Sequence, residues 1–284
     1  MVAKPDPLEV STPTGDSLIR FLLPGAQTRG AIIRGSHLRD EACRAHGLID
    51  ENKHGPGELF GQTLIASILM LSISKGGVRQ VLQLDGSQGP ITRILAETRS
   101  GAVRGYINWN EAASVHGRKS SPLGWLGSPV TVSTVRDPGM GEPYISSIQS
   151  DSKYLADMML DYMRQSVQIR ADVLLHHDTG MLIEAMPGCG EDEWFSAVEA
   201  MAAIPDAVLD DDPEEILKAF APLGMRIVGR DNYRWHCGCD GASMARALAG
   251  MAVETVRELQ DEEGMITVAC QYCGATHSVK PDQT

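Results

Sequence analysis

The chain has 284 residues, and its 25 lysines and arginines against 37 aspartates and glutamates give a formal net charge of −12. An acidic surface repels phosphate backbones and anionic membranes, so the charge argues against nucleic acid and membranes as partners. The length allows one sizeable hydrophobic core with a smaller second unit.

The N-terminal residues 1–17 lack the apolar run of a signal peptide. We therefore expect a short flexible leader and a cytoplasmic protein. The longest apolar stretch, residues 60–73, is shorter than the roughly 20 residues that span a bilayer, and it predicts a buried helix instead. In a reducing cytosol, close cysteine pairs are metal ligands or redox centres more often than structural disulfides.

The segment after the leader alternates strand-like with helix-like patterns. Residues 17–24 and 29–35 predict a β-hairpin, because each is a short apolar run and a turn sequence separates them. Residues 38–47 and 56–74 carry the apolar spacing of helices, and the second is apolar enough to be buried.

A series of strands follows the second helix. Strand-like runs at residues 77–86, 91–99 and 102–109 are separated by turn sequences, which favours an antiparallel meander over βαβ units. Residues 129–137 and 143–149 predict a further hairpin.

The core is expected to close with a helix over residues 152–167, where apolar side chains recur at helical spacing. Together these elements predict the α+β class, with a mostly antiparallel sheet and packed helices. We expect this core domain to cover residues 1–187.

The composition changes in residues 188–230, which we expect to form a helical linker. Between Glu191 and Glu215 there are ten acidic and no basic residues, so like charges repel and make the folded form marginal. Apolar residues still recur at helical spacing, and the expected buried face comprises Trp194, Phe195, Val198, Ile216, Leu217 and Phe220. An ordinary helical linker with a solvated acidic face is the alternative.

Four of the six cysteines form two close pairs near the C-terminus. Cys237 and Cys239 make a C-x-C pair, and after a gap of thirty residues Cys270 and Cys273 make a C-x-x-C pair. Four thiolates suit a closed tetrahedral Zn²⁺ site. Residues 231–284 are too few to build much of a core, so we expect one zinc per chain to supply much of their folding free energy.

Other features of this C-terminal domain leave alternatives open. His236 or His277 could replace one sulfur ligand, although four sulfurs already complete the zinc shell. Residues 244–260 predict one or two helices, and residues 264–269 predict a strand that leads into the second cysteine pair. Because zinc keeps the sulfurs as thiolates, the form that oxidants attack, the site suits an oxidation sensor as well as a structural role.

These features resemble the heat shock protein 33 family of redox-regulated chaperones, also called 33 kDa chaperonins. The cysteine spacing matches the family's zinc signature, and residues 262–274 (EEGMITVACQYCG) are similar to its usual approach to the second pair. Residues 84–107, 141–148 and 162–169 are similar to the family's glycine-rich meander, G-E-x-Y strand and Y-F-x-Q-S-E-Q-I segment. The resemblance covers nearly the whole chain in the same order.

The sequence departs from the family pattern at three places. Val167 stands where the family usually has Glu, residues 176–188 lack the usual Gly-Gly, and residues 237–246 replace the common C-x-C-S-x-E-R. None of these changes removes a zinc ligand.

The resemblance implies an ATP-independent holdase for unfolding client proteins rather than an enzyme. It implies that the zinc-bound domain supports a folded linker in the reduced state. It also implies that oxidation links Cys237 to Cys239 and Cys270 to Cys273, with release of zinc and unfolding of the linker. An oxidised homodimer is a further expectation. Residues 85–90 (DGSQGP) agree with independence from ATP, because they lack the Lys-Ser/Thr ending of a P-loop.

Two other functions would also use paired cysteines. A zinc-ribbon nucleic-acid protein needs a basic surface, whereas residues 231–284 carry four basic residues against eight acidic ones. A C-x-x-C thiol oxidoreductase needs a thioredoxin-like βαβ unit, whereas residues 270–279 predict a knuckle between strands.

The remaining candidate ligands have simpler interpretations. Cys43 is expected to be a small buried residue and Cys189 a loop thiol. His176 and His177 predict a solvated strand end rather than a pair of metal ligands.

Overall fold

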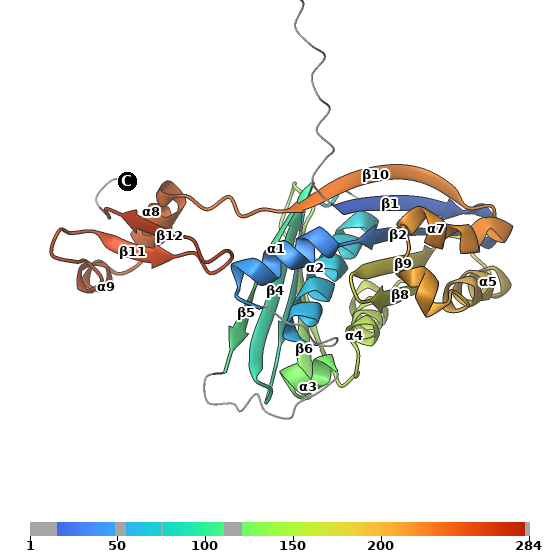
Figure 1. Ribbon diagram of the computed structural model, residues 1–284, viewed down its shortest axis with the longest axis horizontal. Coiled ribbons are helices and arrows are strands. Elements are labelled where there is room, and N and C mark those ends of the chain that lie inside the picture. Colours follow the sequence, from blue (N-terminus) through green and yellow to red (C-terminus); the bar gives the residue numbers. More distant parts are fainter. Residues whose placement is uncertain (1–15, 49–54, 75, 111–120, 282–284) are drawn as a thin grey trace, which may run out of the picture.

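The computed structural model describes residues 16–48, 55–74, 76–110 and 121–281. Figure 1 shows a body of sheet and helices, from which the C-terminal domain projects on one side while the linker helices cover the opposite side. Residues 1–15 of the expected leader lie outside the described residues, and Asp16 and Ser17 belong to the first strand of the sheet.

A ten-stranded sheet forms the body, in the order β7-β6-β3-β4-β5-β10-β1-β2-β9-β8. Every pairing is antiparallel except the one between β10 and β5, so the expected mostly antiparallel α+β fold is confirmed. The predicted hairpins and the meander appear as β1–β2, β6–β7 and β3–β4–β5. The strands are β1 (Asp16–Leu23), β2 (Thr28–Arg34), β3 (Arg79–Asp85), β4 (Ile91–Arg99), β5 (Ala102–Trp109), β6 (Val130–Asp137), β7 (Tyr144–Ser150), β8 (Ala171–His176), β9 (Thr179–Ala185) and β10 (Arg226–Trp235).

The bounds of β8, β9 and β10 are not predicted from the sequence, and β10 is the longest of these three strands. It runs beside β1, and its last residues, Arg234 and Trp235, pair in parallel with β5. Tyr233 is its only buried residue, so the strand lacks the alternating apolar pattern that marks a half-buried strand. The domain boundary expected between residues 230 and 231 falls inside this strand, which leads from the linker to the first cysteine pair.

Helix α2 (Pro56–Ile73) is the centre of the main hydrophobic core. Among the described residues it is the one helix long and apolar enough to cross a membrane, yet 72% of it is buried inside the protein, as expected for a core helix. The other core helices are α1 (Ser36–Ala45), α3 (Pro122–Leu126) and α4 (Leu155–Tyr162), which continues as a π-helical turn, η2 (Met163–Val167).

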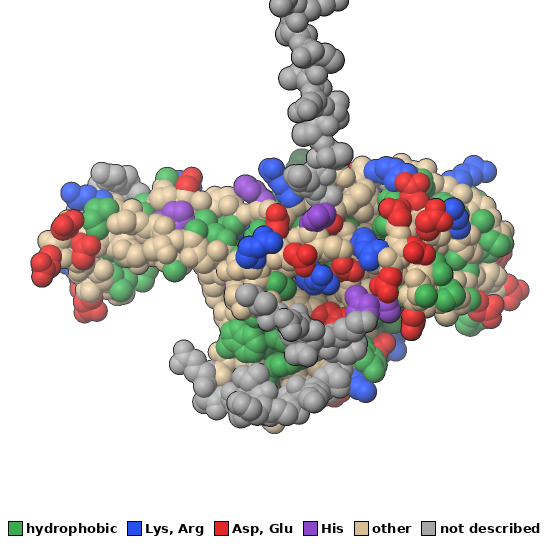
Figure 2. Space-filling view, viewed as in Figure 1, with side chains coloured by type: hydrophobic (Ala, Val, Ile, Leu, Met, Phe, Trp, Pro, Cys, Tyr) green, Lys and Arg blue, Asp and Glu red, His purple; other side chains and the backbone are tan. Residues whose placement is uncertain are grey.

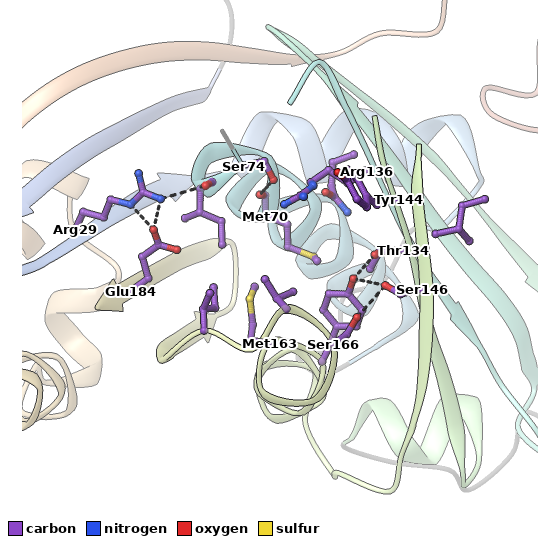
Figure 3. Close-up of a pocket in the computed structure, with 16 residues that line it drawn as sticks. Arg29, Met70, Ser74, Thr134, Arg136, Tyr144, Ser146, Met163, Ser166 and Glu184 are labelled. Carbon is purple, nitrogen blue, oxygen red and sulfur yellow. Dashed lines mark hydrogen bonds and ion pairs between the residues drawn. The ribbon is translucent and has the colours of Figure 1, made fainter. Parts of the chain in front are cut away.

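The two ends of the sheet approach each other around α4, which packs against both β7 and β8. A cavity of about 560 Å³ lies at this place. Figure 3 shows the ion pair of Arg29 and Glu184 on one side of the cavity and a hydroxyl cluster on the other. In that cluster the hydroxyl of Tyr162 lies 2.5 Å from Oγ1 of Thr134 and 2.7 Å from Oγ of Ser146, so α4 is fixed to β6 and β7.

The linker is helical, as predicted, with short elements that pack on β1, β2 and β9. Its elements are α5 (Glu191–Ala202), α6 (Asp206–Leu209), α7 (Pro213–Leu217) and η3 (Lys218–Leu223), and a short turn, η1 (Pro24–Ala26), lies beside them. Ile216, Leu217 and Phe220 are fully buried in the hydrophobic cluster beneath these helices. Figure 2 shows acidic side chains gathered on the outer surface of this part of the protein.

Two expectations for the linker are corrected. Phe195 is 57% exposed, whereas Trp194 and Val198 are partly buried and belong to the cluster. The buried stripe of α5 runs through Ala197 and Met201, and Phe195 lies one position off this stripe. Among the described residues, the cluster draws on the core and the linker but on no side chain of the C-terminal domain, so that domain gives the linker no direct apolar support.

Candidate metal centre

The C-terminal domain is a two-stranded sheet with two short helices. Its elements are α8 (Gly241–Ala249), α9 (Val253–Glu258), β11 (Ile266–Ala269) and β12 (Thr276–Val279), which confirm the predicted helices and the predicted knuckle between strands. Asp240 caps α8 by accepting a hydrogen bond from the backbone N–H of Ser243. Among the described residues, the hydrophobic cluster of the C-terminal domain has four buried members, Ala245, Leu248, Ile266 and Val279. A core this small agrees with a domain that depends on a metal.

The fold brings the two cysteine pairs together. Cys237 and Cys239 follow β10, whereas Cys270 and Cys273 lie in the turn between β11 and β12. This turn is closed by a hydrogen bond from the N–H of Gly274 to the carbonyl of Cys270, and Gly274 has a φ of +71° that favours glycine.

The four sulfurs lie within 4.8 Å of one another. The Sγ atoms of Cys237 and Cys270 are 3.7 Å apart, and those of Cys239 and Cys273 are 3.4 Å apart. A tetrahedral zinc with bonds of about 2.3 Å places its sulfur ligands about 3.8 Å from one another. The predicted ligand set therefore fits a metal of this size and charge.

The surroundings of the sulfurs affect their protonation. Burial raises the pKa of the Cys237 and Cys239 thiols above the ordinary cysteine value. Burial also opposes ionisation of Cys270, but hydrogen bonds from the backbone N–H groups of Tyr272 and Cys273 outweigh it, and the net pKa is lowered. A divalent cation among the sulfurs would favour the thiolate form of all four.

The two histidines considered as alternative ligands lie outside the sulfur cluster. His277 contacts it from the side, with its Nε2 3.2 Å from Sγ of Cys239. His236 is exposed, and its backbone N–H donates to the carbonyl of Val103. Among the described residues the group of candidate ligands at this place consists of the four cysteines alone.

Tyr272, between the cysteines of the second pair, fixes the metal centre to the core sheet. Its ring packs edge-on against Tyr106 at 5.4 Å, and the guanidinium of Arg104 lies 4.1 Å from the ring centre. Its hydroxyl donates to Glu97 at 3.3 Å, and its carbonyl oxygen lies 2.9 Å from Nε2 of His46. The docking of this tyrosine could not be found from the sequence, because its partners are more than 160 residues away.

Glu97 on β4 is the charged centre of this docking site. Its side chain is only 2% exposed, and it forms ion pairs with Arg79, Arg99 and Arg104. Burial raises the pKa of its carboxyl group, but the hydrogen bonds from Arg79 and Arg104 outweigh burial and lower the pKa to about 2. The ion pair of Glu97 and Arg104 could have been predicted from the sequence, because the two residues lie opposite each other on adjacent strands of the predicted meander.

The lowered pKa of Glu97 predicts a pH dependence of stability. The carboxylate contributes to folding fully above about pH 4.5 and loses this contribution as the pH falls toward 2, which is about 3 kcal/mol in all. Glu97→Gln should therefore flatten the free energy of unfolding between pH 4.5 and 2, measured by urea unfolding at several pH values. The exposed Glu142→Gln is the control, and an equal slope in both variants would contradict the prediction.

Cys189 lies in the loop between β9 and α5, as expected, whereas Cys43 is half-buried and not fully buried. Their sulfurs contact the carbonyl oxygens of Ala26 at 3.4 Å and Gly57 at 3.7 Å, respectively. His176 ends strand β8, as expected, but the side chains of His176 and His177 are partly buried, with 21% and 22% exposed.

Comparison with known proteins places this site in a family. The chain is 26% identical over 278 residues to the 33 kDa chaperonin of Geobacter sulfurreducens, covering 91% of this chain and 90% of the relative. It is 24% identical over 282 residues to the 33 kDa chaperonin of Bacillus subtilis, covering 91% of this chain and 93% of the relative. The crystal structure of the 33 kDa chaperonin from Thermotoga maritima has the same fold, with a TM-score of 0.74 at 22% identity over 94% of this chain and 95% of the other.

The family model described as Hsp33 protein matches residues 16–280, which include all ten strands of the core sheet, the linker helices and the four clustered cysteines. This match spans nearly the whole chain, and the protein therefore belongs to the Hsp33 family of chaperones.

Proposed function

We propose that the chain is a redox-regulated, ATP-independent holdase that binds unfolding proteins under oxidative stress in the cytoplasm. The observation that carries this proposal is the convergence of four sulfurs at the end of β10, the strand that contains the last residues of the linker. Because β10 joins the linker to the first cysteine pair, a structural change at the sulfurs can pull directly on the linker through the chain. The proposal treats residues 1–187 as the core, 188–230 as the linker and 231–284 as the switch.

The reduced state is the inactive state in this proposal. Cys237, Cys239, Cys270 and Cys273 hold one Zn²⁺ per chain, and the bound ion supplies folding free energy to a domain with a very small core. The linker helices then cover the apolar surface of β1, β2 and β9.

Activation begins with oxidation of the cysteines. At each pair of thiolates, one molecule of hydrogen peroxide takes two electrons, and its O–O bond breaks to give two hydroxide ions. S–S bonds form between Cys237 and Cys239 and between Cys270 and Cys273, and the oxidised sulfurs would no longer hold a metal. In the folded domain each sulfur also has a close neighbour in the other pair, at 3.7 Å between Cys237 and Cys270 and at 3.4 Å between Cys239 and Cys273. Pairing within each motif is favoured once the domain unfolds, because closing a loop of one or two residues costs little chain entropy.

Unfolding of the switch domain removes the anchor at the end of β10 and thereby loosens the linker. Release of the linker exposes the apolar cluster that Phe21, Ile32 and Ile183 form with it, which suits the apolar segments of an unfolding client. We further propose that the oxidised form is a homodimer. No observation on the described residues favours a nucleic-acid function, and Cys270 lies in a turn between strands, not at the helix N-terminus of an oxidoreductase.

Activity should depend on oxidation combined with heat and not on nucleotide. The reduced protein is expected to carry one zinc per chain and to leave an aggregating client unprotected, whereas the peroxide-treated protein at elevated temperature should have lost zinc and should suppress aggregation by light scattering. Mass spectrometry of the same sample should find the two disulfides within the motifs. Equal suppression by the reduced protein would contradict the switch, and disulfides between the motifs would contradict the pairing.

A further inference from the structure

A second group of metal-ligating side chains lies where the core meets the linker. His176 ends β8, His177 occupies the turn that follows, and Asp210 lies between α6 and α7. One ligand atom from each residue lies within 4.8 Å of the other two. Nε2 of His176 is 3.7 Å from Oδ1 of Asp210, and the two imidazole ring centres are 4.3 Å apart.

The core holds His177 in place from two sides. His177 has a left-handed φ of +49° in the two-residue turn between β8 and β9, and Gln62 donates a hydrogen bond to its carbonyl oxygen at 3.3 Å. Its Nδ1 lies 3.1 Å from Oε1 of Glu58 on α2. A carboxylate at Nδ1 favours the tautomer whose lone pair is on Nε2, and this arrangement orients the histidine ligands of many metal sites.

The linker residue Asp210 is also held in place, through its backbone. Oγ1 of Thr179 donates to the carbonyl of Leu209 at 3.0 Å, and Arg34 donates to the carbonyls of Asp210 and Asp211. These bonds come from β9 and β2, so they fix the loop of Asp210 against the end of the β8–β9 hairpin. The fixed backbone places the carboxylate, whose side chain is 55% exposed, beside His176.

We propose that His176, His177 and Asp210 bind a transition-metal dication such as Zn²⁺, which ties the linker to the core. Two imidazoles and a carboxylate are common ligands of zinc, and water completes the shell. Zinc ligands at about 2.0–2.1 Å lie about 3.4 Å from one another, so side-chain rotation is enough to close the separation of 3.7 Å between His176 and Asp210.

The site would favour the folded linker. The closed linker offers three ligands, whereas an opened linker takes Asp210 away and leaves two, so the ion binds the closed state more tightly. Metal at this site therefore opposes linker opening, independently of the four cysteines. That this delays activation rests on the proposed function.

Metal titration of the intact protein tests the site. Reduced protein already loaded with one zinc is titrated with Co²⁺, and a second equivalent is expected to bind with weak visible bands and without sulfur charge-transfer absorption. Asp210→Asn and His176→Gln should each weaken this second binding about a hundredfold, because each removes a ligand. His37→Gln, which changes an exposed histidine on α1, should leave it unchanged.

Amide exchange tests the link to the linker. In the wild type, Zn²⁺ at about ten times its dissociation constant should slow exchange of residues 206–217 about tenfold, and in Asp210→Asn it should not. Undiminished second binding in Asp210→Asn, or equal exchange with and without the second ion, would overturn the proposal. Neither measurement uses a client, so failure of the oxidised protein to suppress aggregation would count against the proposed function alone.

Discussion

Replacing Cys270 by serine is expected to unfold most of residues 237–281 while the ten-stranded sheet stays folded. Cys270 is the most buried of the four cysteine residues, at 5% exposure, and its loss breaks a closed four-sulfur shell. Structural zinc contributes on the order of 10–16 kcal/mol in small zinc domains, which four buried apolar residues cannot replace. The expected result is loss of bound zinc and fast amide exchange over β11 and β12, measured by elemental analysis and by exchange mass spectrometry.

The two cysteines outside the cluster provide matched controls. Cys43→Ser and Cys189→Ser change half-buried thiols that lie outside the four-sulfur cluster and contact backbone carbonyls, so zinc content should stay at one per chain. Zinc retained in Cys270→Ser at the wild-type affinity would show that the ligand set is wrong. Unfolding of the core sheet in the same variant would show that the two domains do not fold separately.

Local patterns in the sequence predicted most of the fold. The core strands from β1 to β7 are short apolar runs bounded by turn residues, and helix α2 is one long apolar run, so each is recognisable without knowledge of its neighbours. The cysteine ligands were predictable for a different reason, since thiol spacing reflects the chemistry of the metal. β10 has neither signal, because its residues are mostly exposed and its place between β1 and β5 is decided by long-range pairing.

Contacts between distant segments account for the features of the sites that the sequence did not reveal. Tyr272 docks on Glu97 and Arg104, and Asp210 meets His176 only because the linker folds back over β8 and β9. Phe195 shows that the sequence also left burial undecided within a single helix. Phe195 is as hydrophobic as its neighbours Trp194 and Val198, so the sequence alone does not place it outside the buried stripe. The orientation of α5 on the core decides that its side chain is exposed.

Phe220→Ala is expected to open the linker in the reduced, zinc-loaded protein. The Phe220 side chain is fully buried, and its ring lies 5.7 Å from that of Phe21 on β1. Deleting a buried phenylalanine costs about 3–5 kcal/mol, which is a large part of the stability of a whole domain. Local opening of residues 191–223 should therefore become about a hundredfold or more frequent, measured as faster amide exchange.

Phe195→Ala is the matched control, because it removes the same side chain from the same linker at a position that is 57% exposed. It should change exchange of residues 191–223 by less than about threefold, as surface substitutions usually do. If linker opening controls activity, Phe220→Ala should suppress client aggregation without oxidation and with zinc still bound, whereas Phe195→Ala should stay inactive until oxidised. Fast exchange in Phe220→Ala without any gain of activity would show that linker opening is not sufficient for client binding. Equal exchange and equal activity in the two variants would refute the role of the buried cluster in keeping the linker closed.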